Sequence, residues 1–548
     1  MGMLGFHGMG TPRRRFLASG ATLAIAALLM RTVSVSFNAY TATEVGAEGI
    51  GLFTLTMSLY GFFLTLATSG VSLSVTCLVA DAIGRRDGAY ARGMLHRALG
   101  YAAVCGAAAS AALFFGAPML SRVLLRDHRT LISLRVLALG LLPMSFSSVF
   151  SGYFIAVRRA SHNAAVQVSE QWIKIALTVL LLTRMLPMGV EYACLALVLG
   201  GVLGEMLSCL ILFTVYAIDR VRHPFGGDAL VEKRKAGMKP LFAIALPVAF
   251  GAYARSALLS LEHILIPMAL ASAVGGREGA LASYGVLHSM AIPIVLYPMA
   301  VLSSFAGILV PEYTESLARR DERRLHRMTN ESLSLSLLFA YAVCAALFLF
   351  GRELGVCLYH NADAGRYIYC LAPLVPLMYI DHVTDAMLKG IGMQVYSMVV
   401  NILDSVLSIL LILLLLPRFG AMGYVFVIFI AEAFNLTCSY VCMYRKIGTG
   451  LPVRALFRPL PPLLLSCISM HLLTFGTADK APGLVLKMLL FCALNLFFFT
   501  LLDGGGEKGT EVLRRKRREQ RVQRKENAAD FPCRACCPLL KNSDKGDL

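Results

Sequence analysis

Charged residues are scarce in this chain of 548 residues. They account for 15% of the sequence, whereas soluble globular proteins carry about 25%. Hydrophobic residues account for 57%, and the mean hydropathy is +0.68. The few charges are concentrated in short stretches that separate long uncharged ones. This pattern excludes an ordinary soluble protein and predicts many transmembrane helices joined by short loops, because each span needs about 20 mostly apolar residues.

The chain also has no long polar segment between its apolar runs. Its longest internal loop has about 20 residues, and no cluster of residues with a catalytic spacing is present. A membrane enzyme, such as a glycosyltransferase acting on a polyprenyl phosphate, needs a sizeable loop with acids or metal ligands. We therefore predict a protein that is not an enzyme and has no cofactor. A scaffold without transport activity is a further alternative, against which the charges inside the apolar segments argue.

The start of the chain looks like a signal peptide but lacks a cleavage site. The first apolar run, Phe16 to Thr41, follows three arginines as in a signal peptide, but it contains Arg31 and no small-residue cleavage site. We expect it to be retained as the first span.

Of the 14 cysteines, 11 lie in or beside apolar segments, where thiols behave as small hydrophobic groups. Cys533, Cys536 and Cys537 lie in the tail without further ligands nearby.

The two halves of the chain repeat each other. Four sets of similar residues recur at one offset of 234 positions: Arg85-Arg86-Asp87 with Arg319-Arg320-Asp321, Gln167 and Glu170 with Asn401 and Asp404, Asp81 with Glu315, and Gly51 with Gly285. Each set occupies a comparable place in the hydropathy pattern. Two similar halves in so apolar a chain indicate a transporter with internal repeats, whose substrate site lies between the halves.

The apolar runs predict fourteen spans, six in each half and two more after them. They lie near residues 16–42, 50–80, 93–117, 130–157, 164–186, 191–218, 239–270, 281–314, 328–350, 365–389, 395–416, 422–444, 456–476 and 484–502. Because each half has an even number of spans, the repeats are expected to be parallel, related by an axis along the membrane normal. The expected fold is an all-α polytopic membrane protein whose two six-helix repeats form two lobes around a central cavity.

Alternate loops are basic, which predicts that both termini are cytoplasmic. The basic loops lie near residues 85–92, 158–159, 220–239, 319–327, 389 and 445–454. The intervening loops near 187–190, 271–279, 417–421 and 477–483 carry at most one positive residue each. The segment from Arg122 to Arg129 is the exception, with three arginines on the predicted outer side.

These patterns divide the chain into five parts. We predict an N-terminal lobe at 1–218, a cytoplasmic inter-lobe loop at 219–238, a C-terminal lobe at 239–446, two further spans at 447–503 and a basic, disordered cytoplasmic tail at 504–548. The net charge of +18 lies in the loops and the tail, which favours contact with anionic lipid headgroups over nucleic acid. The sequence gives no signal of an oligomer, and a chain with two halves can work as a monomer.

Several short segments carry a resemblance to a known family. They are Gly46-Ala-Glu-Gly-Ile-Gly-Leu52, Tyr60-Gly61, Ser69-Gly70, Leu78-Val79-Ala80-Asp81, Leu309-Val-Pro-Glu312, and Gln167 with Glu170 and Gln171. With these segments the chain, over about residues 13–500, resembles the stage V sporulation protein B family. That family groups with MurJ-like flippases in the multidrug/oligosaccharidyl-lipid/polysaccharide exporter superfamily. The resemblance implies a flippase of the bacterial cytoplasmic membrane, in wall synthesis or sporulation. It would move an undecaprenyl-linked glycan such as lipid II by alternating access.

Two arginines inside spans suit an anionic substrate. A lipid-linked diphosphate needs fixed positive groups in a hydrated cavity, and the planar guanidinium binds phosphate oxygens bidentately. Arg31 lies about 24 Å along the first span, and Arg255 lies at a matching depth in the seventh. A charge there costs at least about 2.5–3.5 kcal/mol, so a functional role is expected. Lipid II flippases similar to this chain often carry a second arginine where Phe37 and Asn38 stand, which argues against lipid II itself but not against transport.

A charged pair lies in the fifth span. Glu170 and Lys174 are four residues apart, so they share a helix face and can neutralise each other. We predict that they contact the substrate. A structural ion pair near the cytoplasmic end of the span is the alternative.

Polar residues in the seventh and eleventh spans suit a coupling cation. Asn401 and Asp404 are three residues apart and face the same side, and Glu262 lies in the seventh span. Two carboxylates and an amide oxygen can bind Na⁺ or share a proton, and similar flippases couple transport to such a site. Other polar residues stay open between interhelical hydrogen bonding and a transport pathway: Asp381, His382, Asp385, Glu432 and Asn435. His288 is expected to be a hydrogen-bonded interior side chain.

The main alternative function is a cation-coupled multidrug exporter with the same fold. An exporter of cationic drugs needs acids and aromatic side chains facing its cavity. Arg31 and Arg255 favour an anionic substrate instead. The flippase is therefore the preferred hypothesis.

Overall fold

The described part of the chain is almost entirely helical and contains no strand. The computed structural model describes residues 11–499, apart from 86, 158, 223–236, 275, 449–456, 458, 474–482 and 485. The predicted tail at 504–548, with its three cysteines, and most of the predicted inter-lobe loop lie outside the described residues. The prediction of an all-α polytopic membrane fold is confirmed.

The first half of the chain begins with one long, kinked helix. Its elements are α1 (Thr11–Thr68), α2 (Val71–Gly84), α3 (Gly88–Met119), η1 (Leu120–Leu124), η2 (His128–Thr130), α4 (Leu131–Ala156), α5 (Ala160–Met185), η3 (Leu186–Met188) and α6 (Val190–Arg222). The backbone of Gly46 leaves the helical conformation inside α1, at φ 79° and ψ 168°. Gly70, with φ 75°, separates α1 from α2. Both dihedrals lie in regions that glycine adopts readily and other residues rarely do.

The second half contains more interruptions. Its elements are α7 (Met238–Val274), α8 (Arg277–Gly285), η4 (Val286–Ala291), α9 (Ile292–Leu296), α10 (Met299–Ala318), α11 (Glu322–Tyr359), α12 (Ala362–Leu371), η5 (Ala372–Leu374), α13 (Val375–Gly390), α14 (Gln394–Ile447) and α16 (Leu460–Leu473). A further short apolar helix spans Leu486–Phe499. Pro298 stands between α9 and α10, and Gly420 breaks the helical dihedrals inside α14. Proline removes a backbone donor, which accounts for a helix break at that position.

Nine helical segments of the described chain are long and apolar enough to cross a membrane. Two of them, Leu29–Ile83 and Gln394–Ile447, contain 55 and 54 residues. A single crossing needs about 20 residues. Each segment therefore has the length for two crossings, with the turn at Gly46 or Gly420. The count of fourteen spans stays a prediction.

The internal repeat is visible in identical local geometry. Asp87 begins α3 and accepts a hydrogen bond from the backbone N–H of Tyr90 at 2.9 Å, and its φ and ψ are −93° and 81°. Asp321 begins α11 and accepts the same bond from Arg324 at 3.0 Å, with −90° and 79°. Both aspartates are N-caps that satisfy an otherwise unpaired helix donor.

The turn before each of these caps repeats as well. Arg85 pairs with Asp81 at 2.8 Å, and Arg319 pairs with Glu315 at 2.7 Å. In both pairs the arginine follows the acid by four residues, so the two side chains share a helix face. The offset of 234 positions found in the sequence is thus an equivalence of structure.

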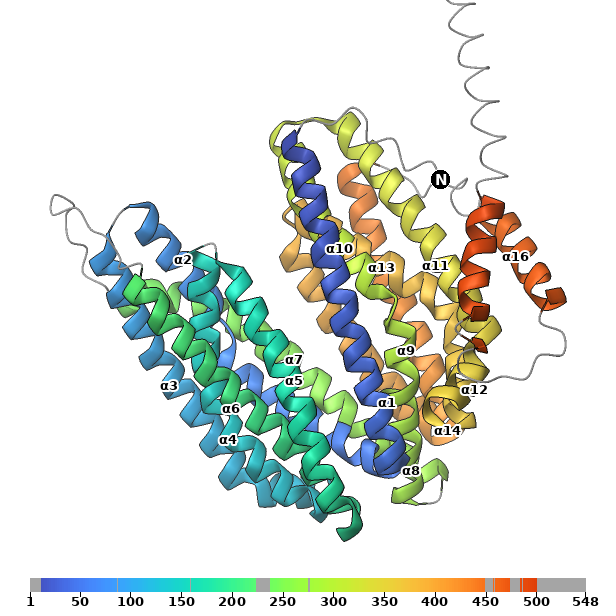
Figure 1. Cartoon of the computed structure of the whole chain (residues 1–548), viewed down its shortest axis with the longest axis horizontal. Coiled ribbons are helices and arrows are strands. Elements are labelled where there is room, and N and C mark those ends of the chain that lie inside the picture. Colours follow the sequence, from blue (N-terminus) through green and yellow to red (C-terminus); the bar gives the residue numbers. More distant parts are fainter. Residues whose placement is uncertain are drawn as a thin grey trace, which may run out of the picture.

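The helices form two bundles that are joined through α1 and α7 (Figure 1). The first part of α1, drawn in dark blue, lies against the C-terminal bundle beside α10, and Asn38 donates a hydrogen bond to the carbonyl of Ser289 at 2.6 Å. The start of α7 packs the other way. Leu241 belongs to the buried core of the N-terminal bundle, and Gly70 closely approaches the backbone of Ala245. Each half of the chain therefore extends its first helix onto the other half.

The bundles meet tightly at the end opposite the basic loops. A Cβ atom on Gly285 would lie 2.8 Å from the backbone nitrogen of Gly51, which is too close for any side chain. Nearby, Arg277 contacts the carboxylate of Asp127 at 3.4 Å and also donates to the carbonyl of Leu125. These contacts connect α8 to the segment between η1 and η2.

One arginine of the arginine-rich segment on the predicted outer side, Arg129, is ion-paired. Arg129 binds Asp127 at 3.0 Å and Glu48 at 2.7 Å. Burial opposes ionisation of Asp127, but its hydrogen bonds with Arg129 and the charges of Arg129 and Arg277 hold its pKa below the ordinary value. Part of the positive charge that breaks the loop pattern is therefore neutralised inside the fold.

Candidate functional site

Arg31 and Arg255 lie on the two helices that connect the bundles. Arg31 is on α1 next to Thr32, whose hydroxyl lies 2.8 Å from the phenol oxygen of Tyr297. Arg255 is on α7 next to Ser256, which accepts a hydrogen bond from Thr65 at 3.0 Å. Both guanidinium groups are exposed, and neither forms a hydrogen bond or an ion pair with the described residues. With no direct hydrogen bond or ion pair, the two guanidinium groups are available to an anionic ligand.

The predicted cation-site residues are brought together by the packing of α7 along α14. Asp404 on α14 lies within electrostatic range of Glu262 and Arg255 on α7. Asn401, one turn earlier, donates its amide N–H to the carbonyl of Ser397 at 2.7 Å. Its side-chain oxygen is left to accept a hydrogen bond or bind a cation. Two carboxylates and one amide oxygen thus share a region of the C-terminal bundle.

Two further acids extend this group. Asp381 on α13 and Glu432 in the second part of α14 both lie within electrostatic range of Asp404 and of each other. One buried oxygen of Asp381 and one of Asp404 have no hydrogen-bond partner among the described residues. Unpaired buried carboxylate oxygens are costly, so a proton or a cation would stabilise them.

Asp385 differs from its neighbours because it is fully paired. Lys389 binds it at 2.6 Å, and the hydroxyl of Ser397 donates to its other oxygen. His382 lies 3.0 Å from the hydroxyl of Ser303. These two residues therefore serve interhelical hydrogen bonding, one of the two roles that the sequence left open.

A pair of histidines lies beside Glu262 in the same bundle. The rings of His263 and His288 are 4.4 Å apart. Tyr284 lies 3.1 Å from the Nδ1 of His263, and Tyr424 lies 3.3 Å from the Nε2 of His288. The expectation that His288 is a hydrogen-bonded interior side chain is confirmed.

Glu170 and Lys174 do not pair with each other. Glu170 accepts a hydrogen bond from Ser208 at 2.7 Å, and Lys174 lies within electrostatic range of Glu205 on α6. Glu205 in turn accepts a hydrogen bond from the buried phenol of Tyr60 at 2.9 Å. The four-residue spacing permits an ion pair, but Glu170 is bound by Ser208 on α6, and Lys174 lies near a different acid on that helix.

Glu205, Asp381 and Glu432 belong to the polar groups that the sequence did not assign to a site. Glu205 and Glu432 are single acids within long apolar stretches, and that isolation is the signal that marks them, whereas Asp381 has His382 and Asp385 close by in the chain. In the described ranges no three His, Cys, Asp or Glu side chains are grouped closely enough to hold a metal ion. The cation site at Glu262, Asn401 and Asp404 has two such side chains and an amide oxygen, and it stays a prediction.

Comparisons with known proteins group this chain with membrane exporters. The profile of the family "Polysaccharide biosynthesis protein" matches residues 16–312, just over half of the chain, and the MatE profile matches residues 256–414. The stage V sporulation protein B of Bacillus subtilis (strain 168) is 26% identical over 416 residues, covering 75% of this chain and 80% of that protein. Lipid II flippase MurJ of the same organism is 23% identical over 430 residues, covering 74% and 78%.

Solved structures share the fold. An inward closed conformation of lipid II flippase MurJ has a TM-score of 0.69 at 12% identity and covers 88% of this chain and 98% of its own. An inward-facing multidrug resistance MATE family transporter of the MOP superfamily has a TM-score of 0.65 at 16% identity and covers 78% and 98%. At these identities the likeness establishes the arrangement of helices. It leaves the transported molecule open.

Proposed function

The chain belongs to the polysaccharide biosynthesis protein family of MOP-superfamily transporters, and on this premise we propose that it flips a lipid-linked cell-envelope precursor. It is a multi-pass membrane transporter and not an enzyme. The proposed substrate is an undecaprenyl diphosphate glycan, of which lipid II is one example. Alternating access between the two bundles is the proposed mechanism, with the basic loops and both termini on the cytoplasmic side.

The observation that carries the proposal is the free pair of arginines on α1 and α7. Arg31 and Arg255 lie on the helices through which the bundles are joined, and neither forms a hydrogen bond or a direct ion pair with the described residues. Guanidinium groups bind phosphate oxygens with two parallel hydrogen bonds, which suits a diphosphate. A cationic drug would be repelled by the same two groups.

The acidic group of the C-terminal bundle supports a coupling cation. We propose that Glu262, Asn401 and Asp404 bind Na⁺ or a proton, with Asp381 and Glu432 adding negative charge. The unpaired oxygens of Asp381 and Asp404 support this role, because a cation would satisfy them. Arg255 lies within range of Asp404, so occupation of one site is expected to alter the charge felt at the other.

A multidrug exporter is the second candidate. The MatE profile match at residues 256–414 and the same acidic group favour it, since acids attract cationic drugs. The two candidates differ in the charge of the transported molecule. Translocation measured after replacement of the two arginines therefore distinguishes the two candidate functions.

The test is translocation of fluorescent lipid II in proteoliposomes. The double variant Arg31→Ala/Arg255→Ala should lose most of the activity, whereas Arg31→Lys/Arg255→Lys should retain part of it, because lysine keeps the charge without the bidentate fork. Arg184→Ala is the matched control, since this exposed arginine lies in the last turn of α5. All variants must first insert and unfold thermally like the native chain.

Each outcome decides one point. Activity that persists in the double alanine variant would remove the role given to the arginines but keep the function. A native chain that moves neither lipid II nor other polyprenyl diphosphate glycans, with or without Na⁺ and proton gradients, would contradict the proposed function. Export of a cationic dye by that same chain would then favour the multidrug alternative.

A further inference from the structure

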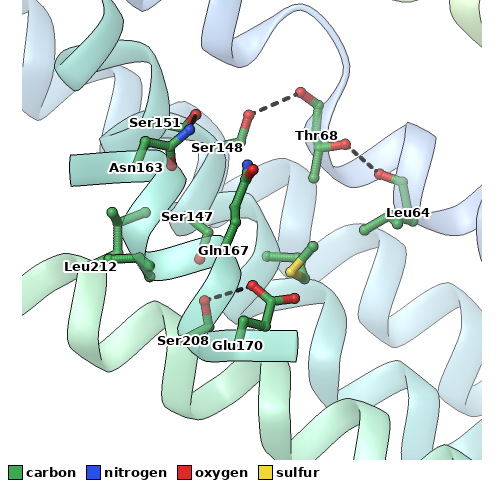
Figure 2. A pocket seen from close by; sticks show the side chains of 12 residues that line it. Leu64, Thr68, Ser147, Ser148, Ser151, Asn163, Gln167, Glu170, Ser208 and Leu212 are labelled. Carbon is green, nitrogen blue, oxygen red and sulfur yellow. Dashed lines mark hydrogen bonds between the residues drawn. The ribbon is translucent and has the colours of Figure 1, made fainter. Parts of the chain in front are cut away.

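An open cavity of about 230 Å³ with both polar and apolar lining lies in the N-terminal bundle, between α1, α4, α5 and α6 (Figure 2). Its polar lining comes from Ser147, Ser148 and Ser151 on α4, Asn163, Gln167 and Glu170 on α5, Ser208 on α6 and Thr68 on α1. Leu64, Met144, Val166 and Leu212 complete it with apolar surface. The cavity is smaller than the about 300–1,000 Å³ that hold drug-sized ligands, so it fits one small chemical group.

Several hydrogen-bonding groups of this cavity have no partner among the described residues. Gln167 points into it and forms no hydrogen bond, so both amide N–H groups and the carbonyl are available. Asn163 donates to Ser151 at 2.9 Å, which leaves its carbonyl free. The buried hydroxyl of Ser147 also lacks a partner, apart from the weakly polar thiol of Cys209.

The remaining carboxylate is already engaged. Glu170 accepts the hydrogen bond of Ser208, and Ser148 contacts the carbonyl of Thr68 at 3.4 Å. The lining holds no cationic side chain. A phosphate would therefore meet a carboxylate without a counter-charge, whereas a neutral group with hydroxyls finds both donors and acceptors.

We propose that this cavity binds a sugar ring of the transported lipid, an inference that rests on the proposed flippase function. A sugar presents hydroxyl and acetamido groups at its edge and C–H groups on its faces. The amides and serines match the edge, and the apolar residues Leu64, Met144 and Leu212 match the faces. The cavity thus selects for a glycosylated lipid over the same lipid without its sugar.

The position of the cavity suits binding of a sugar next to a diphosphate held by the arginines. Leu64 and Thr68 line it from one turn of α1, and Thr65 in that turn binds Ser256 on α7. Ser256 directly follows Arg255. The segment of α7 that carries Arg255 therefore packs against the same turn of α1 that lines the cavity, which is the arrangement that a diphosphate at Arg255 and a sugar in the cavity require.

Its counterpart in the other bundle has a different chemistry. Gln167 and Glu170 are the repeat equivalents of Asn401 and Asp404. In the C-terminal bundle these positions are surrounded by Glu262, Asp381 and Glu432, which favour a cation. Around Gln167 the polar neighbours are amides, hydroxyls and the single carboxylate of Glu170, which already accepts a hydrogen bond from Ser208, and this set favours a neutral polar ligand.

The only tryptophan of the chain provides a local reporter. Trp172 lies on α5, two residues beyond Glu170, and its side chain is exposed. The native full chain in nanodiscs would be titrated with undecaprenyl diphosphate and with undecaprenyl diphosphate bearing one N-acetylhexosamine, while Trp172 emission is followed. The native chain should bind the glycosylated lipid about tenfold more tightly, because two or three hydrogen bonds are added.

The decisive variant is Gln167→Met, which keeps the length of the side chain but removes its hydrogen bonds. It should bring the affinity for the glycosylated lipid down to that for the bare lipid and leave the bare lipid unaffected. Gln171→Met is the matched control on the same helix and should retain the preference, because Gln171 does not line the cavity. Arg31→Ala/Arg255→Ala should instead weaken both lipids about equally.

The outcomes separate this proposal from the function on which it rests. Equal native affinity for the two lipids, or equal weakening of both by Gln167→Met, would overturn the sugar site and leave the flippase intact. An emission change caused by Na⁺ alone and removed by Gln167→Met, with the lipid preference unchanged, would make the cavity a cation site and also overturn it. Native protein that binds neither lipid would overturn the flippase function and this proposal together.

Discussion

Gly51 and Gly285, which occupy equivalent positions in the two repeats, lie directly against each other where the bundles meet. A Cβ on either residue would lie within 3.3 Å of the backbone of the other. Residues related by an internal two-fold axis contact each other only where they lie close to that axis. The two glycines therefore mark the axis at the end opposite the basic loops, and they permit the backbones of α1 and α8 to touch.

The contact predicts a clear cost for any added side chain. Gly285→Ala should destabilise the protein by about 1–3 kcal/mol, because the new methyl group would clash with the carbonyl of Ala47 and the backbone of Gly51. The measurement is the midpoint of thermal unfolding in nanodiscs. Gly61→Ala is the control on α1, since no atom lies within 4 Å of its Cβ position. The control should gain up to about 1 kcal/mol, because alanine favours the helix. A Gly285→Ala protein as stable as the control would contradict the tight contact.

The ion pairs of Asp127 predict a loss of stability in acid. Its pKa is held below the ordinary value, so its contribution is fully present above the unfolded pKa of about 3.9 and is lost as the pH falls through the lower folded pKa. At pH 7, Asp127→Asn should lower stability by about 1–3 kcal/mol. The unfolding midpoint of the native chain should fall more steeply below about pH 4 than that of Asp127→Asn. Parallel curves for the two proteins would exclude this role.

The proposed coupling site predicts that Asp404→Asn impairs cation dependence rather than folding. The Na⁺ concentration for half-maximal translocation should rise at least about tenfold, because affinity for a cation follows the number of charged ligands. If protons are the coupling ion, the response to a pH gradient should be lost instead. Glu278→Gln, an exposed acid in the first turn of α8, should behave like the native chain. An Asp404→Asn variant with unchanged responses to both ions would remove this site from the mechanism.

The kink of α1 predicts intolerance at Gly46. Its φ of 79° and ψ of 168° lie in a region almost reserved for glycine, so Gly46→Ala should cost about 1–3 kcal/mol. No atom lies within 4 Å of the Cβ position, which makes the backbone the sole cause. Gly307→Ala in α10 has similar open space and lies within a regular helix, so it should lose nothing. The measurement is thermal unfolding. Equal midpoints for the two variants would show that the kink relaxes without cost.

The fold could be predicted from the sequence because a membrane restricts the secondary structures that a chain can form. Long apolar runs can only be helices in lipid, and the offset of 234 positions identified the two repeats. Asp87 and Asp321 confirm that offset through the same capping geometry. The pairing of Arg129 could not be foreseen, since Glu48 lies 81 residues away in the chain. Only the packing of α1 near η2 brings them together.

Only part of the candidate site could be predicted from the sequence. Single charges in apolar runs identified Arg31, Arg255 and Asp404, because such charges are rare without a role. Their partners depend on helix packing, which the spacing along one helix does not determine. Glu170 illustrates this point: its neighbour Lys174 has the right spacing, but Ser208 from α6 takes the hydrogen bond.

The crossing of α1 and α7 between the bundles has a mechanical consequence. If each bundle contained only its own helices, the two could separate as independent bodies joined at one end. Here α1 is anchored to the C-terminal bundle through Asn38, and the start of α7 is anchored to the N-terminal core through Leu241. Because α1 and α7 are each attached to both bundles, rotation of one bundle relative to the other moves both helices at once. A motion that displaces Arg31 therefore also displaces Arg255.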